Sequence, residues 1–140
     1  MLAVVLPVVC LAAHAEPQRV ELYAGMFRIS AEVASDYSSR AIGLMNRSMM
    51  AEQDGMIFVY PDKGVHCMWM KNTPIPLSVA FLEDDGTIIN VERMAPQTEA
   101  NHCAKAPARF ALEMNGGWFE SKKLGPGLRI KGVEALPKGQ

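Results

Sequence analysis

The chain has 140 residues, of which 49% are hydrophobic and 21% are charged, and its formal net charge is -1 at pH 7. This length and hydrophobic content fit one globular domain with its own core. The balanced charge disfavours a nucleic-acid-binding protein, which normally carries a basic excess, and the sequence contains no block of like charges and no internal repeat.

The N-terminal segment MLAVVLPVVCLAAHA is uncharged and ends in Ala13-His14-Ala15, and a polar stretch follows. An apolar run that ends in an A-x-A sequence is typical of a secretory signal peptide, although the positive charge that usually precedes the run is missing here. The run is shorter than the roughly 20 apolar residues that span a bilayer. We therefore expect a signal peptide over residues 1–15, a mature domain over residues 16–140 with no stable membrane span, and a periplasmic or secreted location. An uncleaved N-terminal anchor is the alternative.

The first part of the mature chain predicts a hairpin and a helix. Residues 19–34, RVELYAGMFRISAEVA, alternate between the two faces of a strand around a turn-forming Ala-Gly pair, which indicates a β-hairpin. The two-residue period is then lost, and apolar residues recur at helical spacing. We expect one short helix that begins at Ser35 or Asp36, either of which can cap it, and that ends near Asn46.

Six later segments have the apolar content and the flanking turn residues of strands: GMIFVYP, VHCMWM, LSVAFL, TIINVERM, RFALEM and LRIKGV. A long polar loop is expected over residues 95–108, and NGGWFESKKL allows a second helical stretch. About seven or eight short strands with one or two short helices predict a mainly β fold, a single-domain β-sandwich or barrel. An α+β arrangement is the alternative.

Several of these stretches together resemble the DUF192 family, also called UPF0127: SRAIGLMNRSMMAEQDGMIFVY, MWMKNTPIPLSVAFLEDDGTI, ARFALEMNGGW and LGPGLRI, over roughly residues 20–133. The resemblance implies a mainly β, sandwich-like fold, and it implies no activity because the family is uncharacterised. The family's motif falls on Arg40, Gly43, Leu44, Met45, Trp69, Met70, Lys71, Asn72, Thr73, Pro76 and Glu113. The cysteine pair and its neighbouring histidines lie outside this motif and resemble a feature of an exported subgroup.

The stretch VHCMWMKNT, residues 65–73, contains a histidine, a cysteine, two methionines, a tryptophan and a lysine. Side chains on a strand point to alternate faces. A strand here would place His66, Met68 and Met70 on one face and Cys67, Trp69 and Lys71 on the other.

Cys67 and Cys103 are the two cysteines that remain after Cys10 leaves with the signal peptide. An even pair in an oxidising compartment predicts a disulfide, and closing its loop would stabilise the fold by about 4 kcal/mol in the loop-entropy model. A reduced metal-binding pair and a redox-active pair are the alternatives. His66 and Cys67 are unsuited to binding one ion together, because adjacent residues on a strand face opposite ways.

The opposite face of this stretch permits a different metal hypothesis. His66, Met68 and Met70 combine an imidazole with two thioethers, a soft ligand set that suits Cu(I). The alternative is that methionines at strand spacing belong to the core, since methionine is a good filler of irregular gaps.

The polar residues Lys71, Asn72 and Thr73 follow the predicted strand directly and precede a rigid Pro-x-Pro segment. Loops on a rigid scaffold often carry binding groups, but Asn72 and Thr73 can also simply stabilise a turn. Glu113 points away from the apolar face of its strand, and we expect a structural ion pair with Lys71 or Arg40. The alternative is that Glu113 is a carboxylate of a site.

These observations predict a non-catalytic binding module, without a cofactor, for a small ligand or a cell-envelope component. The residues expected to bind are Arg40, Trp69, Met70, Lys71, Asn72, Thr73 and Glu113. The alternatives are an enzyme in which Lys71 and Glu113 transfer protons, and a copper carrier that uses His66, Met68 and Met70. The sequence contains no nucleophile elbow, phosphate-binding Gly loop or HExxH motif.

Overall fold

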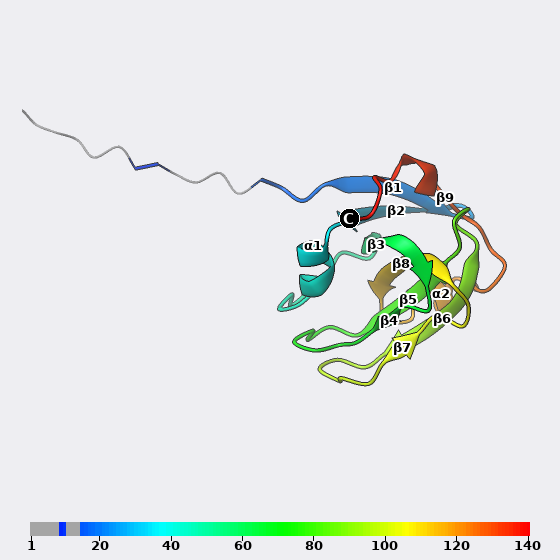
Figure 1. Ribbon diagram of the computed structural model, residues 1–140. Coiled ribbons are helices and arrows are strands. Elements are labelled where there is room, and N and C mark those ends of the chain that lie inside the picture. Colours follow the sequence, from blue (N-terminus) through cyan, green and yellow to red (C-terminus); the bar gives the residue numbers. More distant parts are fainter. Residues whose placement is uncertain (1–8, 11–14) are drawn as a thin grey trace, which may run out of the picture.

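The computed structural model describes residues 9–10 and 15–140 (Figure 1). The predicted signal peptide over residues 1–15 therefore lies mostly outside the described residues. Within the described part of the chain, no helix has the length and apolar character that crossing a membrane requires.

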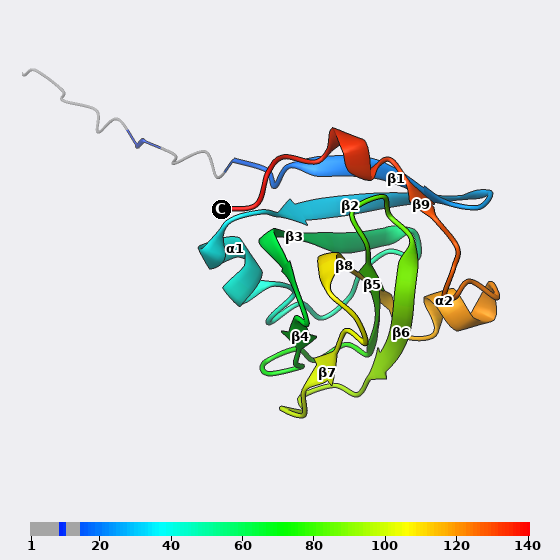
Figure 2. The same cartoon turned by 45° about the vertical axis from the view of Figure 1, so that its right-hand side comes forward.

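A curled sheet of seven strands in the order β6-β5-β8-β3-β2-β1-β9 forms the body of the domain (Figure 2). Neighbouring strands pair antiparallel, except that β2 and β3 run parallel. The mainly β fold predicted from the sequence is confirmed. The strands are β1 (Arg19–Ala24), β2 (Phe27–Ala34), β3 (Asp54–Gly64), β5 (Leu77–Leu82), β6 (Ile88–Met94), β8 (Ala108–Asn115) and β9 (Ile130–Lys131).

The sheet curls into a half-barrel whose two edges meet at one end. There the Ile88 N–H donates to the Leu128 carbonyl and the Ile130 N–H donates to the Gly86 carbonyl, each at 2.8 Å. Gly86 has a φ of +91°, and a Cβ at this position would lie 2.2 Å from the Ile130 carbonyl oxygen. Only glycine permits this close approach, so the EDDG turn before β6 also joins the two edges at this end of the half-barrel.

A two-stranded ribbon, β4 (Cys67–Met68) and β7 (His102–Cys103), lies outside the main sheet. Cys67 and Cys103 face each other across the ribbon, and the disulfide between them confirms the predicted bridge. The strand predicted over residues 65–70 is therefore too long, and His102 and Cys103 form a strand rather than a loop. The ladder stops after Met68 because the next inward residue, Met70, donates its N–H to the Thr98 carbonyl instead.

Helix α1 (Tyr37–Ile42) begins where the sequence predicts. Asp36 is its N-cap: the side chain accepts from the Ser39 N–H, and the Ser39 hydroxyl completes a capping box. The helix ends before Asn46, earlier than expected, because Gly43 adopts a φ of +48° and leaves the helical path. The early end directs the following loop back over β3, where it helps to enclose the candidate site.

Two shorter helical segments lie near the C-terminus. Helix α2 (Trp118–Ser121) confirms the second predicted helical stretch. A single 3-10 turn, η1 (Val133–Ala135), ends the last predicted strand after only two residues, since Gly132 turns the chain with a φ of +104°. The C-terminal residue lies near the start of α1, with the Gln140 N–H donating to the Ser35 carbonyl (Figure 1).

Apolar side chains are buried on both faces of the curled sheet. One core cluster includes Leu22, Ile57 and Leu112, and the other, which lies beside the candidate site, includes Phe58 and Met70. Successive residues of a strand point to opposite faces, so Leu112 and Glu113 on β8 enter different environments. This alternation places the Glu113 carboxyl among the second cluster.

Candidate functional site

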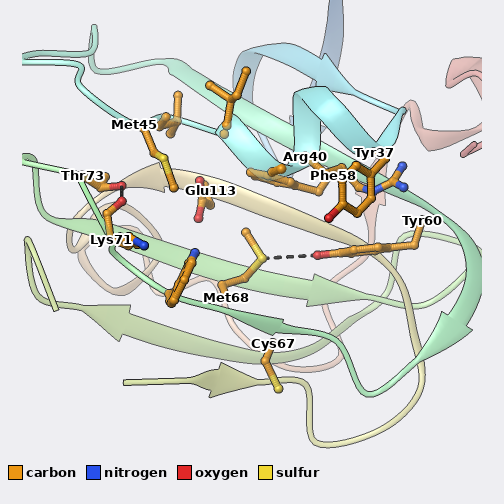
Figure 3. Close-up of a pocket in the computed structure, with 15 residues that line it drawn as sticks. Tyr37, Arg40, Met45, Phe58, Tyr60, Cys67, Met68, Lys71, Thr73 and Glu113 are labelled. Atoms are coloured by element: carbon orange, nitrogen blue, oxygen red, sulfur yellow. Dashed lines mark hydrogen bonds between the residues drawn. The ribbon is translucent and has the colours of Figure 1, made fainter. Parts of the chain in front are cut away.

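A cavity of about 340 Å³ opens between α1, the loop after it, β3 and residues 67–73 (Figure 3). Its apolar surface includes Leu44, Met45, Phe58 and Met68, and three further aromatic rings, Tyr37, Tyr60 and Trp69, border it. Its size lies at the lower end of the range for small-molecule sites, which are concave and mostly apolar with a few polar groups.

Five of the predicted binding residues line this cavity: Arg40, Trp69, Lys71, Thr73 and Glu113. They come from α1, from the segment after β4 and from β8, so the fold joins three distant parts of the sequence (Figure 3). Met70 and Asn72 are not among the lining residues. That the five bind a ligand stays a prediction.

Glu113 is the most deeply buried polar residue of the cavity, with 3% of its surface exposed. Met56 on β3 and Val79 on β5 flank it across the sheet. Among the described residues its carboxyl makes no hydrogen bond and no ion pair. Burial raises the pKa of this carboxyl to about 8, because no nearby donor or cation offsets the loss of water. The group is therefore mostly protonated at neutral pH.

Arg40 does not pair with Glu113, which corrects the ion pair expected from the sequence. Its guanidinium donates to the carbonyls of Ser35 at 2.8 Å, Val59 at 3.0 Å and Gln140 at 2.6 Å. These bonds tie α1 to β3 and to the C-terminus, and the same guanidinium lies 5.7 Å from the centroid of the Tyr60 ring. Arg40 is thus held by the fold while it borders the cavity.

Lys71 does not reach Glu113 either. Its ammonium lies over the Trp69 ring, 5.2 Å from the ring centroid, and both side chains are at the surface. An exposed cation–π contact of this kind contributes about 0.5–1 kcal/mol. The predicted Lys71–Glu113 pair is therefore wrong for the described structure, because the lysine points along the outer wall while the carboxyl lies deep in the cavity.

The Asn72-Thr73 pair forms a tight turn, which agrees with the alternative that these two residues stabilise a turn. Asn72 is exposed with a φ of +53°, a conformation that asparagine tolerates better than most residues, and its carbonyl accepts from the Asn46 N–H. The Thr73 hydroxyl donates to the Lys71 carbonyl at 3.0 Å. Thr73 is buried and lines the cavity, so it combines a turn-stabilising bond with a place in the wall.

The proposed soft-metal ligands are each engaged elsewhere. His66 stacks on Tyr60 with ring centroids 3.6 Å apart, and its Nε2 lies 2.9 Å from the Asp62 carbonyl. The Met68 sulfur accepts from the Tyr60 hydroxyl at 3.3 Å, while Met70 is fully buried in the second core cluster. In the described part of the chain, no group of three or more His, Cys, Asp or Glu residues is arranged to hold a metal. Met68 and Met70 therefore occupy core positions.

The aromatic side chains that α1 and β3 contribute to the cavity were not predicted from the sequence. Tyr37, Phe58 and Tyr60 line the cavity, and burial is the main reason that the pKa of Tyr60 rises to about 12. Met56, Phe58 and Tyr60 alternate along β3 and share the Glu113 face. This alternation within GMIFVYP was a usable signal, but it gains meaning only once β3 and β8 are known to be neighbours.

Comparisons with known proteins identify structural relatives. A Sinorhizobium meliloti 1021 protein, described as a proposed transcription regulator, is 34% identical with a TM-score of 0.79, over 86% of this chain and 98% of its own. A protein of unknown function from Novosphingobium aromaticivorans DSM 12444 is 26% identical with a TM-score of 0.73, over 91% of this chain and 93% of its own. Functionally curated proteins yield no match.

The family model of DUF192, described as "Uncharacterized ACR, COG1430", matches residues 20–132. These residues include the whole curled sheet except its first residue, both walls of the cavity and the disulfide ribbon. The chain therefore belongs to the DUF192 family.

Proposed function

We propose that this protein is a non-catalytic binding module that holds a small ligand in the cavity between α1, β3 and residues 67–73. The observation that carries the proposal is the Glu113 carboxyl, which is buried in the cavity wall without a partner among the described residues. Burying an unpaired ionisable group costs free energy. A fold that keeps such a group beside an open cavity leaves its hydrogen-bonding capacity free for a ligand.

The size of the cavity favours a small molecule over an extended cell-envelope component. A volume of about 340 Å³ accommodates a compact molecule, and the lining is largely apolar with polar groups at a few positions. We further propose that the protein is exported to the periplasm or secreted. The Cys67–Cys103 disulfide supports this location, because disulfides persist mainly in oxidising compartments.

An enzyme is the second candidate, favoured by the pKa of Glu113 near 8. A carboxyl with a pKa close to neutrality can both accept and donate a proton at physiological pH. Among the described lining residues, no side chain is positioned as a nucleophile beside a base, so proton transfer is the chemistry that the arrangement permits. The Sinorhizobium protein is described as a proposed transcription regulator. Proteins that bind DNA usually carry an excess of basic residues, and the net charge of -1 in this chain does not favour that role.

A fragment screen by ligand-observed NMR tests the binding function. Ala41→Trp places a large ring in the cavity lining, and Ser38→Trp places the same ring at an exposed position of α1 outside the lining. We expect fragments that bind the wild type and Ser38→Trp but not Ala41→Trp. Fragments that bind all three proteins equally, or none, would contradict the proposal. A fragment that is chemically altered by the wild type but not by Glu113→Gln would favour the enzyme.

A further inference from the structure

We propose that the ligand of this cavity is a small organic cation, a protonated amine on an apolar group, whose ammonium pairs with the Glu113 carboxylate. This inference rests on the proposed binding function and specifies its ligand class. It follows from which charged groups border the cavity, where the structure holds them, and what surrounds the unpaired carboxyl.

Glu113 is the sole acidic residue among the described residues of the lining. The titratable groups that share its cavity are Tyr37 and Arg40 from α1, Tyr60 from β3 and Lys71 from the segment after β4. The residues that flank it on the neighbouring strands, Met56 and Val79, carry no charge. The deep end of the cavity therefore offers a carboxyl and no cation to neutralise it.

The two cations of the wall are held away from this carboxyl. Backbone carbonyls and the Tyr60 ring hold the Arg40 guanidinium, and Lys71 lies over Trp69 at the surface, where salt screens its charge. An anionic ligand that reached Glu113 would meet an acidic group without a free cation beside it. A ligand ammonium, in contrast, would supply the missing partner of the carboxylate.

The remaining surface suits the apolar part of such an amine. Phe58, Leu44 and the thioethers of Met45 and Met68 line the cavity next to Glu113 and would cover an alkyl or aryl group. The faces of aromatic rings also attract a positive charge more than aliphatic surface does. The volume of about 340 Å³ limits the ligand to a small amine.

Binding of the ammonium is expected to release the proton that Glu113 holds below pH 8. With the pKa of this carboxyl at about 8, the ionised fraction of Glu113 rises about tenfold from pH 6 to pH 7 and levels off above pH 8. The affinity for an amine should follow this fraction as long as the amine itself stays protonated. A neutral ligand that accepts a hydrogen bond from protonated Glu113 would show the opposite dependence.

Isothermal titration calorimetry with hexylamine, 1-hexanol and hexanoate tests the proposal on the intact protein. These probes share one alkyl chain and differ in the polar group. We expect hexylamine to bind at least tenfold more tightly than either of the others at pH 8. From pH 8 to pH 6 its affinity should fall by roughly fifty-fold in all, and proton release should rise from about half a proton per amine bound at pH 8 to about one at pH 6.

Two variants sharpen the test. Glu113→Gln should remove both the preference for the amine and the pH dependence, whereas Glu134→Gln, at an exposed position outside the cavity lining, should keep both. Equal binding of hexanol or hexanoate, or amine binding that does not change with pH, would overturn the inference while the binding function stands. Failure of all three probes would also overturn it, and the Ala41→Trp fragment screen then reports on the function separately.

Discussion

Two glutamates expose almost equally little surface in this domain, but Glu113 lies deeper than Glu32 and the two face opposite electrostatic conditions. Glu32 on β2 is 5% exposed and Glu113 on β8 is 3% exposed. Glu32 is paired with Arg47, whose Nη2 donates to Oε2 at 2.8 Å, and with Arg19 at 3.2 Å. These arginines, Arg47 first, hold the pKa of Glu32 below its usual range, whereas burial without a partner raises the pKa of Glu113 to about 8.

The contrast separates a structural carboxylate from one that is available to a ligand. Arg19 reaches Glu32 because β1 and β2 pair with these two residues in register, and Arg47 reaches it from the loop after α1. No cation of the described fold reaches Glu113 in the same way. The depth of burial and the charged partners within reach together decide whether an acidic residue stays ionised.

The largest expected effect is that of Glu113→Gln on the pH dependence of stability. Because the folded-state pKa of Glu113 is raised from 4.5 to about 8, the wild type should lose unfolding free energy as the pH rises through that window. The slope is about 1.4 kcal/mol per pH unit, which gives about 5 kcal/mol over the whole window. Above pH 8 the variant should be the more stable protein. Urea unfolding from pH 5 to 9 measures this, with exposed Glu134→Gln as a control that should match the wild type.

The second effect concerns the ribbon that carries Cys67 into the cavity wall. Replacing Cys67 and Cys103 by serine should lower the unfolding free energy by about 4 kcal/mol. A looser wall should also admit water and lower the pKa of Glu113, measured by NMR titration of the labelled carboxyl. Glu134→Gln, at an exposed position outside the ribbon, is the control. An unchanged Glu113 titration would show that the ribbon does not contribute to its desolvation.

The third effect is a pH dependence of stability opposite in direction to that of Glu113. Glu32→Gln removes the negative charge between Arg47 and Arg19 and should cost about 2 kcal/mol at neutral pH. In the wild type this stabilisation is present above the ordinary pKa of 4.5 and is lost as the pH falls through the lower folded-state pKa. Thermal unfolding between pH 3 and 7 measures it. Glu21→Gln, which disturbs an exposed pair with Arg28 on the same hairpin, should cost less than about 0.5 kcal/mol.

The smallest expected effect is that of Lys71→Met on stability. Lys71 contacts the Trp69 ring at the surface and has no ion-pair partner among the described residues. Its loss should change the unfolding free energy by no more than about 1 kcal/mol. A loss several times larger, measured by urea unfolding, would mean that Lys71 compensates the buried Glu113 at longer range, and the contrast with Glu32 would then be weaker.

Local features of the chain were predictable because they depend on residues close in sequence. The hairpin over residues 19–34 follows from alternation and a turn-forming pair, and the start of α1 follows from the capping capacity of Asp36. The alternation in VHCMWMK predicted that Met68 and Met70 face one way and Cys67 and Trp69 the other. In the structure Met68 and Met70 are buried and Cys67 and Trp69 are exposed, although only Cys67 and Met68 lie in a strand.

The partners of charged side chains were not predictable in this way. The sequence indicated that Arg40, Lys71 and Glu113 are polar residues of one motif, and opposite charges made an ion pair the simplest expectation. In the structure, the Arg40 guanidinium is held by carbonyls of Ser35, Val59 and Gln140, which belong to three separate parts of the chain. Such contacts depend on where distant segments pack and leave no local pattern.

The sequence by itself thus determined the β-rich class, the family and the cysteine pair, because periodicity, motif spacing and cysteine number are properties of the chain. Only the tertiary structure decided that Glu113 lies opposite Met56 and Val79, deep in a cavity whose other wall comes from α1 and β3. The state of a carboxyl depends on the water and the charges within a few ångströms of it. Strand order and loop packing set these surroundings, and they gave Glu32 two arginines and left Glu113 with none.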